Sequence, residues 1–382
     1  MGWPTDDESA LATEVARLLE RTASREDLKA TVQPSSVQHD LAWKQLANQL
    51  GAAGLAVPEE LGGAGADLGA LAVVAEQIGR ACAAVPFLST AIATTALAAV
   101  DDTEILPAVA SGQRTAVLAA PLDGSPLTVT AVGGALTGSV DVIDALTADL
   151  LIVAARAAGG TALFVVEAST TRRTPLHTLD LGRPQARVEL ANTRARELAA
   201  DAGPALRAGR QVARLLLAAE NLGIADWCLQ TAVEYAKTRE QFGVKIGTFQ
   251  AVKHLCAEMF FATEVARALL VSAVELCRGE VKAPGRTALN AAALACAETA
   301  VSATQGAVQV LGGIGFTWEH DAHLYFRRAR ANAVLTGSTA ATKDSLAELL
   351  IAGKGIAGPA PPMSAEVAAF GEQARAFFAT HA

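Results

Sequence analysis

Apolar residues recur at three- and four-residue spacing from Asp6 to about Gly112, in segments such as SALATEVARLLERTA and ADLGALAVVAEQIGRAC. Such spacing puts the apolar side chains on one face of a helix, so the pattern predicts helices. Between two of these segments lies VPEELGGAGAD, whose proline and glycines predict a turn-rich loop. We therefore expect an N-terminal helical domain over residues 1–113.

From about Thr115 the pattern changes to short β-rich runs, among them TAVLAAP, ADLLIVAAR and TALFVVEA, separated by Gly, Pro and Asp. These runs predict a small antiparallel sheet, a middle β-domain over residues 114–200. Helical spacing then returns, and residues 201–382 are expected to form a C-terminal helical domain. Its helices are predicted at about Gly209–Lys237, Thr248–Arg278 and Arg286–Leu311, with shorter ones beginning near Glu319, Ala340 and Ser364. The fold class is thus α+β, mainly α, in three units.

The composition narrows the classes of partner. The chain has 382 residues, 51% of them hydrophobic, and a formal net charge of −8 at pH 7. Such an acidic chain offers no basic face for nucleic acid or anionic lipid, so a small molecule or another protein is the expected partner. The N-terminal stretch has no signal-peptide core, and the longest apolar stretch, STAIATTALAAV, is too short to cross a bilayer. We expect a soluble cytoplasmic protein without membrane insertion.

Two stretches carry residue types suited to a phosphate-bearing ligand. Arg239 lies in YAKTREQFGVKIG, and Gly312 and Gly313 follow the helical segment that ends at Leu311. Each has a purely structural interpretation, since Arg239 beside Glu240 can form an exposed ion pair and the glycines can end a helix. Each also has a functional one. A guanidinium forms forked hydrogen bonds with phosphate oxygens, and backbone without Cβ atoms lets a pyrophosphate come close.

Three stretches together are more specific than either motif. GLAVPEELGGAGADL (Gly54–Leu68), YAKTREQFGVKIGTFQAVKHLCAEM (Tyr235–Met259) and VQVLGGIGFTWEHDAHLYFRRARA (Val308–Ala331) resemble the acyl-CoA dehydrogenase family, in sequence and in order. The resemblance extends over nearly the whole chain. It implies an N-terminal helical domain, a middle β-domain and a C-terminal four-helix-bundle domain.

The resemblance also implies a cofactor and a reaction. Members of the family remove a proton from the carbon alpha to a CoA thioester and pass the beta hydrogen to FAD as hydride, and an electron-transfer flavoprotein is the expected electron acceptor. Some family positions reach across a subunit interface to the adenosine and pyrophosphate half of a neighbour's FAD. The matching residues in this chain are Arg239, Gln241, Phe242, Gln309, Gly312 and Gly313.

The family's catalytic base is a Glu, and neither of its two usual positions holds one here. Thr336, in VLTGS, matches the Glu of most members, and a hydroxyl without an activator cannot act as a base near neutral pH. Ala213, directly before Arg214, matches the position that a minority of members use. Glu220 lies two turns later on roughly the same helix face, about 10 Å farther along. It is a candidate substitute base, or else a polar residue that lines a pocket or bonds to another helix.

The β-domain departs from the family as well. Members usually carry Trp-Ile-Thr or Trp-Ile-Ser against the flavin, and this chain has Val142 and Asp144 at the matching positions. An ionised Asp there would repel the negative charge of reduced flavin. The family's glycine-rich loop after the first strand is reduced to APLDGSP, Ala120–Pro126.

The residues lost are those a subunit uses on its own flavin and substrate, whereas the residues kept are those it extends to a neighbour's flavin. We therefore expect the non-catalytic subunit of a heterotetrameric (α2β2) acyl-CoA dehydrogenase, similar to the enzymes of steroid side-chain CoA thioesters. FAD would be shared at the interface, and a second family subunit would carry the Glu base. Two other hypotheses stay open. One is a self-sufficient flavoenzyme with Glu220 or Asp144 as an unusual base, and the other is a flavin-free scaffold.

The segment WEHDAHLYFRRARA combines histidines with a basic run. His320 and His323 lie three residues apart, but no further ligand cluster supports a metal site, so we expect interface contacts or polar packing instead. The basic run Arg327–Ala331 is expected to pair with acidic residues across a subunit contact.

Overall fold

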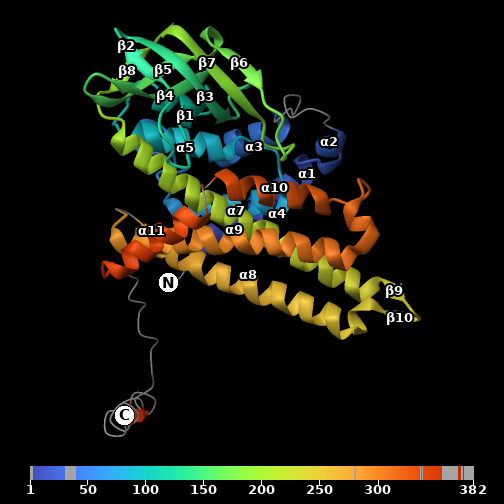
Figure 1. Ribbon diagram of the computed structural model, residues 1–382. Coiled ribbons are helices and arrows are strands. Elements are labelled where there is room, and N and C mark those ends of the chain that lie inside the picture. Colours follow the sequence, from blue (N-terminus) through green and yellow to red (C-terminus); the bar gives the residue numbers. More distant parts are fainter. Residues whose placement is uncertain are drawn as a thin grey trace.

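A computed structural model describes residues 3–30, 40–278, 281–335, 337, 339–354, 369–370 and 373. Thr336 and Ser364 lie outside the described residues. Figure 1 shows the sheet at the top, the long C-terminal helices below it, and the N-terminal helices packed beside these helices, with one of them reaching the sheet. The expected fold class is thereby confirmed, with helices first, strands in the middle and helices last.

The N-terminal helices have local start signals and buried faces. α1 (Asp6–Thr22) begins with a capping box, in which Glu8 N–H donates to the Thr5 hydroxyl and Thr5 N–H donates to the Glu8 carboxylate. α5 (Phe87–Ala98) is buried on nearly every side, because it packs against both β1 of the sheet and α7 (Gly203–Thr238). The other elements of this part are α2 (Arg25–Ala30), α3 (Asp40–Leu50), α4 (Leu68–Ala81), α6 (Leu106–Ala110) and the short turns η2 (Ala52–Gly54) and η3 (Glu59–Leu61).

The middle part is an 8-stranded sheet in the order β6-β7-β3-β2-β4-β5-β8, with β1 beside β4. Its strands are β1 (Ala116–Ala119), β2 (Thr130–Val132), β3 (Ala135–Ile143), β4 (Leu150–Ala157), β5 (Gly160–Glu167), β6 (Arg172–Pro175), β7 (Gln185–Arg194) and β8 (Arg196–Ala199). Most neighbours are antiparallel, but β1 pairs with β4 in parallel, with Leu118 opposite Ile152. β2 also meets β4 in parallel. The prediction of an antiparallel sheet is wrong for these pairs, because periodicity identifies a strand without its neighbour.

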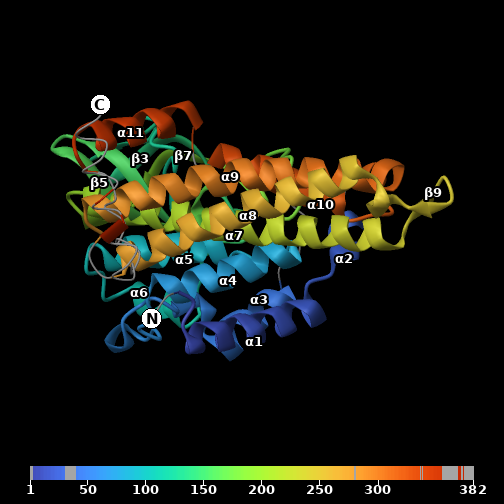
Figure 2. The same cartoon turned by 90° about the horizontal axis from the view of Figure 1, so that it is seen from below.

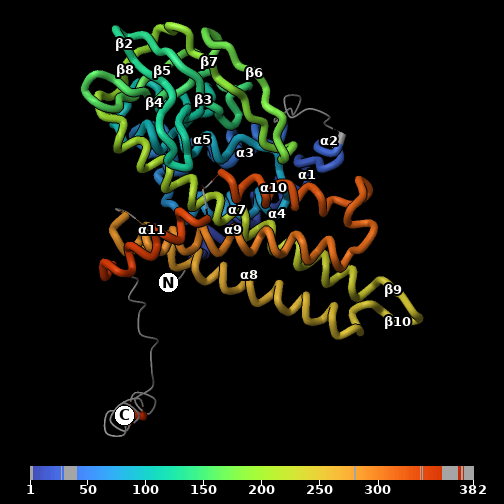
Figure 3. Tube along the Cα trace, in the orientation of Figure 1, coloured from blue at the N-terminus to red at the C-terminus, as the bar shows by residue number. Residues whose placement is uncertain are grey.

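The C-terminal part is built on three long helices, which lie where the apolar spacing predicted them. α7 is followed by α8 (Gln250–Cys277), α9 (Ala283–Leu311), α10 (Ala322–Leu335) and α11 (Thr339–Ile351). Figure 3 shows α7 running from the sheet to the hairpin of β9 (Glu240–Gln241) and β10 (Val244–Lys245). Among the helices of the described residues, none is long and apolar enough to cross a membrane.

α4 and α7 cross at two glycines. A Cβ on Gly79 would collide with the backbone oxygen of Glu220, and a Cβ on Gly223 would collide with that of Glu76. The two helix backbones can approach this closely only because both positions lack a side chain. This crossing fixes the part of α7 that carries Glu220.

Candidate functional site

A cavity of about 520 Å³ lies between the sheet and the end of α10. Its walls come from the loop Pro121–Pro126 after β1, from β3 and the start of β7, and from the last residues of α10. Val142 and Leu335 contribute apolar surface. Arg187, at one wall, donates two parallel hydrogen bonds to Asp141 at 2.8 and 2.9 Å. The shortened loop therefore still borders a cavity large enough for a small organic ligand.

Val142 and Asp144 do not share this cavity. Val142 lines it, but β3 ends at Ile143 and Asp144 has a φ of 55°, which breaks the alternation of side chains along the strand. Asp144 is only 4% exposed, and its carboxylate accepts a hydrogen bond from Ser89 Oγ at 2.6 Å. Asp144 therefore does not line the cavity that Val142 lines, and its carboxylate is bonded to the N-terminal helical part instead.

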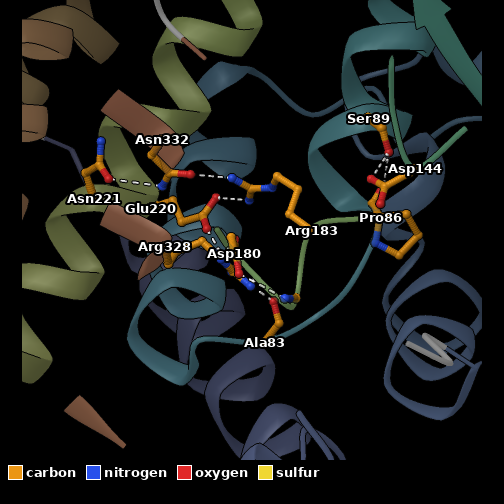
Figure 4. A network of polar contacts seen from close by, with 11 residues as sticks. Ala83, Pro86, Ser89, Asp144, Asp180, Arg183, Glu220, Asn221, Arg328 and Asn332 are labelled. Carbon is orange, nitrogen blue, oxygen red and sulfur yellow. Dashed lines mark hydrogen bonds and ion pairs between the residues drawn. The ribbon is translucent and has the colours of Figure 1, made fainter. Parts of the chain in front are cut away.

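Glu220 lies in a buried network of polar contacts (Figure 4). Its carboxylate accepts hydrogen bonds from Arg183 Nη2 at 2.6 Å and from Arg328 Nη1 at 3.0 Å, and the residue is 3% exposed. Arg328 also pairs with Asp180, and Arg183 donates to Asn332. Burial opposes ionisation of Glu220, but the two guanidinium groups outweigh it and hold the pKa below its ordinary value. An ionised carboxylate with both oxygens bonded to arginines is poorly placed to take a proton from a ligand.

The network also corrects the interpretation of the basic run. Arg328 is fully buried and pairs with Asp180 and Glu220 inside the chain, so the expected pairing across a subunit contact is wrong for this residue. The position of Arg328 around the helix was the sequence signal that could have revealed its burial. Arg328 follows Tyr325 by three residues and precedes Asn332 by four, and both of these residues are buried on the inward face of α10.

The loop expected to carry the base borders the cavity. Thr336 itself is outside the described residues. On one side of it Leu335 lines the cavity, and on the other side a Cβ on Gly337 would lie 3.3 Å from Asp123 Cβ. Ala213, the alternative position for the base, is buried in α7 and offers only a methyl group. The described lining of the cavity thus contains no Glu.

The hairpin of β9 and β10 extends beyond the ends of α7 and α8 (Figures 1 and 2). Arg239, Gln241 and Phe242 are all exposed, and Phe242 is 93% exposed. Glu240 pairs with Lys245 at 2.7 Å rather than with Arg239. Arg239 forms no ion pair with any described residue, so the local interpretation as an Arg239–Glu240 pair is wrong.

The end of α9 is exposed as well. Gln309 faces solvent, and the turn η6 (Gly312–Phe316) follows directly. Gly312 has a φ of 63° and its N–H donates to the Val308 carbonyl, so it does end the helix. A Cβ on Gly312 or Gly313 would meet no atom of the chain within 4 Å. The glycine backbone therefore faces open space.

The hairpin and η6 lie at the same end of the bundle in both views (Figures 1 and 2). Large apolar side chains are exposed around them, with Phe316 85% exposed and Trp318 56% exposed. Phe260 and Phe261, in the first half of α8, are exposed too. Monomers rarely expose this much aromatic surface, so the face is suited to protein contact. Sequence periodicity did not reveal it, because aromatic residues on a helix are ordinarily taken as core.

Comparisons with known proteins identify the family of the chain. Residues 5–113 match the acyl-CoA dehydrogenase N-terminal domain, and residues 204–351 match the acyl-CoA dehydrogenase C-terminal domain. The chain is 34% identical over 342 residues to the acyl-CoA dehydrogenase IpdE2 of Mycobacterium tuberculosis, which covers 88% of this chain and 94% of that protein. The chain belongs to the acyl-CoA dehydrogenase family.

Two solved structures of acyl-CoA dehydrogenase complexes are also similar. The Tcur3481–Tcur3483 steroid ACAD variant is 29% identical, with a TM-score of 0.81 over 91% of this chain and 98% of that one. The ChsE4–ChsE5 complex from Mycobacterium tuberculosis is 27% identical, with a TM-score of 0.80 over 93% of this chain and 99% of that one. The expected class, an oxidoreductase acting on CH–CH bonds, is confirmed, and so is the resemblance to heteromeric steroid acyl-CoA dehydrogenases.

Acyl-CoA dehydrogenases use FAD. The predicted contact residues of this chain have side chains and backbone suited to the adenosine and pyrophosphate half of that cofactor. Arg239 supplies a guanidinium that pairs with no carboxylate in the described part of the chain, and Gln241 and Gln309 supply exposed amides. Gly312 and Gly313 leave the space that a close pyrophosphate would need. None of the predicted FAD contacts lines the chain's own 520 Å³ cavity.

Proposed function

We propose that this chain is the base-lacking subunit of a heteromeric FAD-dependent acyl-CoA dehydrogenase. It supplies contacts from the hairpin and from the end of α9 to an FAD shared with a partner subunit of the same family. The partner carries the Glu that removes the alpha proton of a CoA thioester, with a steroid side chain as the expected acyl group. When bound, FAD would supply the hydride acceptor for the beta hydrogen, and an electron-transfer flavoprotein would be the electron acceptor of the complex.

The observation that carries this proposal is the separation between the predicted FAD contacts and the chain's own cavity. Arg239, Gly312 and Gly313 are open to a ligand that approaches from outside the chain. The cavity, in contrast, has Val142 where the family has an aromatic residue, and its described lining contains no Glu. A subunit that assists a neighbour's flavin and performs no chemistry in its own cavity would retain and lose residues in this pattern.

The residues of this chain would bind and orient the cofactor. The Arg239 guanidinium can donate to pyrophosphate oxygens without giving up another partner, because no described carboxylate holds it. The glycines can present backbone N–H groups at close range. The exposed side chains of Phe316 and Trp318 can pack against the partner, and this packing would exclude water from the contact.

The two other hypotheses receive less support. A self-sufficient enzyme needs a base within hydrogen-bond reach of the alpha proton. Glu220 is held by Arg183 and Arg328, and the Asp144 carboxylate is bonded to Ser89 outside the cavity. A flavin-free scaffold would have no need for an exposed arginine without a described ion-pair partner at the end of the bundle where glycine backbone is also open.

Flavin stoichiometry tests the proposal. This chain would be co-produced with a family member that has Glu at the usual base position, and the complex would be purified through a tag on this chain. We expect one FAD for each pair of unlike chains, and dehydrogenation of acyl-CoA only by the complex. One FAD for every chain would mean that both cavities hold flavin, and the proposal would be wrong.

A further inference from the structure

A second, smaller cavity lies beside the large one. It measures about 60 Å³, and its lining includes Arg214, Asn290 and Asp123. Asp123 lines both cavities. Leu335 of the large cavity and Gly337 of the small one flank the base position in sequence. The small cavity therefore adjoins the large cavity at Asp123.

Arg214 is a partly buried cation that pairs with no carboxylate of the described residues. Its Nη1 donates to Asn290 Oδ1 at 3.2 Å, and no described carboxylate lies within ion-pair distance of it. Arg210, one turn earlier on α7, donates to the Pro121 carbonyl at 3.2 and 3.1 Å and to no other described residue. Burial, together with this neighbouring arginine, lowers the pKa of Arg214. An anion bound at the small cavity would relieve both effects.

The one acid in the lining does not neutralise the two arginines. Asp123 accepts hydrogen bonds from Ser125 N at 3.0 Å and from Ser125 Oγ at 2.6 Å. These bonds, with a smaller contribution from Arg210, lower the pKa of Asp123, so it carries one negative charge. Arg210 and Arg214 carry two positive charges. Among the described residues, these three side chains leave one net positive charge at the small cavity.

We propose that Arg214 binds the carboxylate group of an organic acid whose apolar part lies in the 520 Å³ cavity. The proposal rests on the proposed function, because only a chain whose own cavity holds no flavin has room for such a ligand. The chain's own cavity is then a binding site for a free acid and not a reaction site for a thioester.

The dimensions and surfaces of the two cavities fit this class of ligand. A volume of 60 Å³ is several times the roughly 15 Å³ that one water needs, so the small cavity has room for a carboxylate group but not for a ring. The guanidinium of Arg214 can bond a carboxylate through two nitrogens. Val142, Val334 and Leu335 offer apolar surface in the large cavity. A phosphate dianion is less suitable, because it is larger and the Asp123 carboxylate would repel it more strongly.

Titration calorimetry on the flavin-free full chain tests the proposal. The probes are cyclohexanecarboxylate, the neutral cyclohexanecarboxamide, and formate. We expect the carboxylate to bind at least 10-fold more tightly than the amide, and more tightly than formate, which has no apolar part. Arg214→Gln should weaken binding of the carboxylate about 10- to 100-fold, because it removes a charged hydrogen-bond donor. Arg214→Lys should restore part of the affinity.

Arg207→Gln is the matched control. Arg207 is an exposed arginine on the same helix, and it lines neither of the two cavities. The proposal is overturned if the amide binds as tightly as the carboxylate, or if both Gln variants weaken binding equally. It is also overturned if formate binds as tightly as cyclohexanecarboxylate, which would mean that the small cavity takes only a free anion. The amide comparison uses the unaltered chain, so it stands even if Arg214→Gln does not fold.

The proposed function can fail separately from this inference. Flavin absorbance in the purified chain would show that the chain holds FAD unaided, whatever the calorimetry reports. Acid binding in a colourless chain supports the inference, and its absence in a colourless chain contradicts the inference alone.

Discussion

Glu220→Gln should destabilise the fold strongly. The reason is the loss of buried ion pairs, since Glu220 is not a catalytic base in this account. The Glu220 carboxylate accepts from Arg183 at 2.6 Å and from Arg328 at 3.0 Å, in a site from which water is excluded. A Gln at this position has no charge and turns an NH2 group toward a guanidinium. Removing one partner of a buried ion pair costs about 3–5 kcal/mol. We expect the free energy of unfolding to fall by about that amount.

The assay is urea unfolding of the flavin-free chain, with Glu240→Gln as the matched control. Glu240 also pairs with a cation, Lys245, at 2.7 Å, but both side chains are exposed. Exposed pairs of this kind often contribute nothing measurable, so the control should unfold like the parent. If Glu220→Gln leaves the unfolding transition unchanged, the network does not hold the domains together and our account of Glu220 is wrong.

The pH dependence of this effect has a definite sign. The folded-state pKa of Glu220 lies below its ordinary value of 4.5, because the two arginines outweigh burial. The stability that the charge contributes is therefore fully present above pH 4.5 and is lost as the pH falls through the lower folded-state pKa. The difference in unfolding free energy between parent and Glu220→Gln should be constant at neutral pH and shrink in acid. A difference that grows in acid would contradict the assigned direction.

Three further predictions concern the cofactor and the base. Arg239→Ala should weaken FAD retention by the complex about 10- to 100-fold, through loss of charged hydrogen bonds, and unchanged flavin content would contradict the contact. Gly313→Ala should leave unfolding unaltered, since a Cβ there meets no atom within 4 Å, but it should lower the FAD content; equal flavin in both proteins would show that no ligand approaches this backbone. Thr336→Ala should leave turnover of the complex nearly unchanged, whereas a fall of about 100-fold or more would identify Thr336 as part of the acid–base chemistry.

The arrangement of helices and strands could be predicted from the chain, but strand partners could not. The spacing of apolar residues located α7, α8 and α9, because a helix face repeats every three or four residues. The parallel pairing of β1 with β4 depends on contacts between segments far apart in sequence. No local pattern encodes that choice.

The sequence predicted the candidate site only where a residue's position depends on its neighbours along the chain. Helical arithmetic placed Glu220 on the same face as Ala213, but its partners Arg183 and Arg328 are 37 and 108 residues away in sequence. The role of Glu220 as a buried ion-pair partner therefore follows only from the folded structure. The surroundings of Asp144 were hidden for a different reason. It was matched to a family position, but β3 ends at Ile143 and Asp144 itself has a positive φ, which a sequence pattern does not reveal.

The central claim is that this chain lacks its own flavin and assists the flavin of a partner. The most direct test is the visible absorption spectrum of the chain purified alone and then mixed with an acyl-CoA. We predict a colourless protein that becomes yellow only when it is co-produced with a base-bearing subunit. Flavin absorbance in the isolated chain that bleaches on addition of acyl-CoA would contradict the account, because it would mean a complete enzyme with a base that we have not identified.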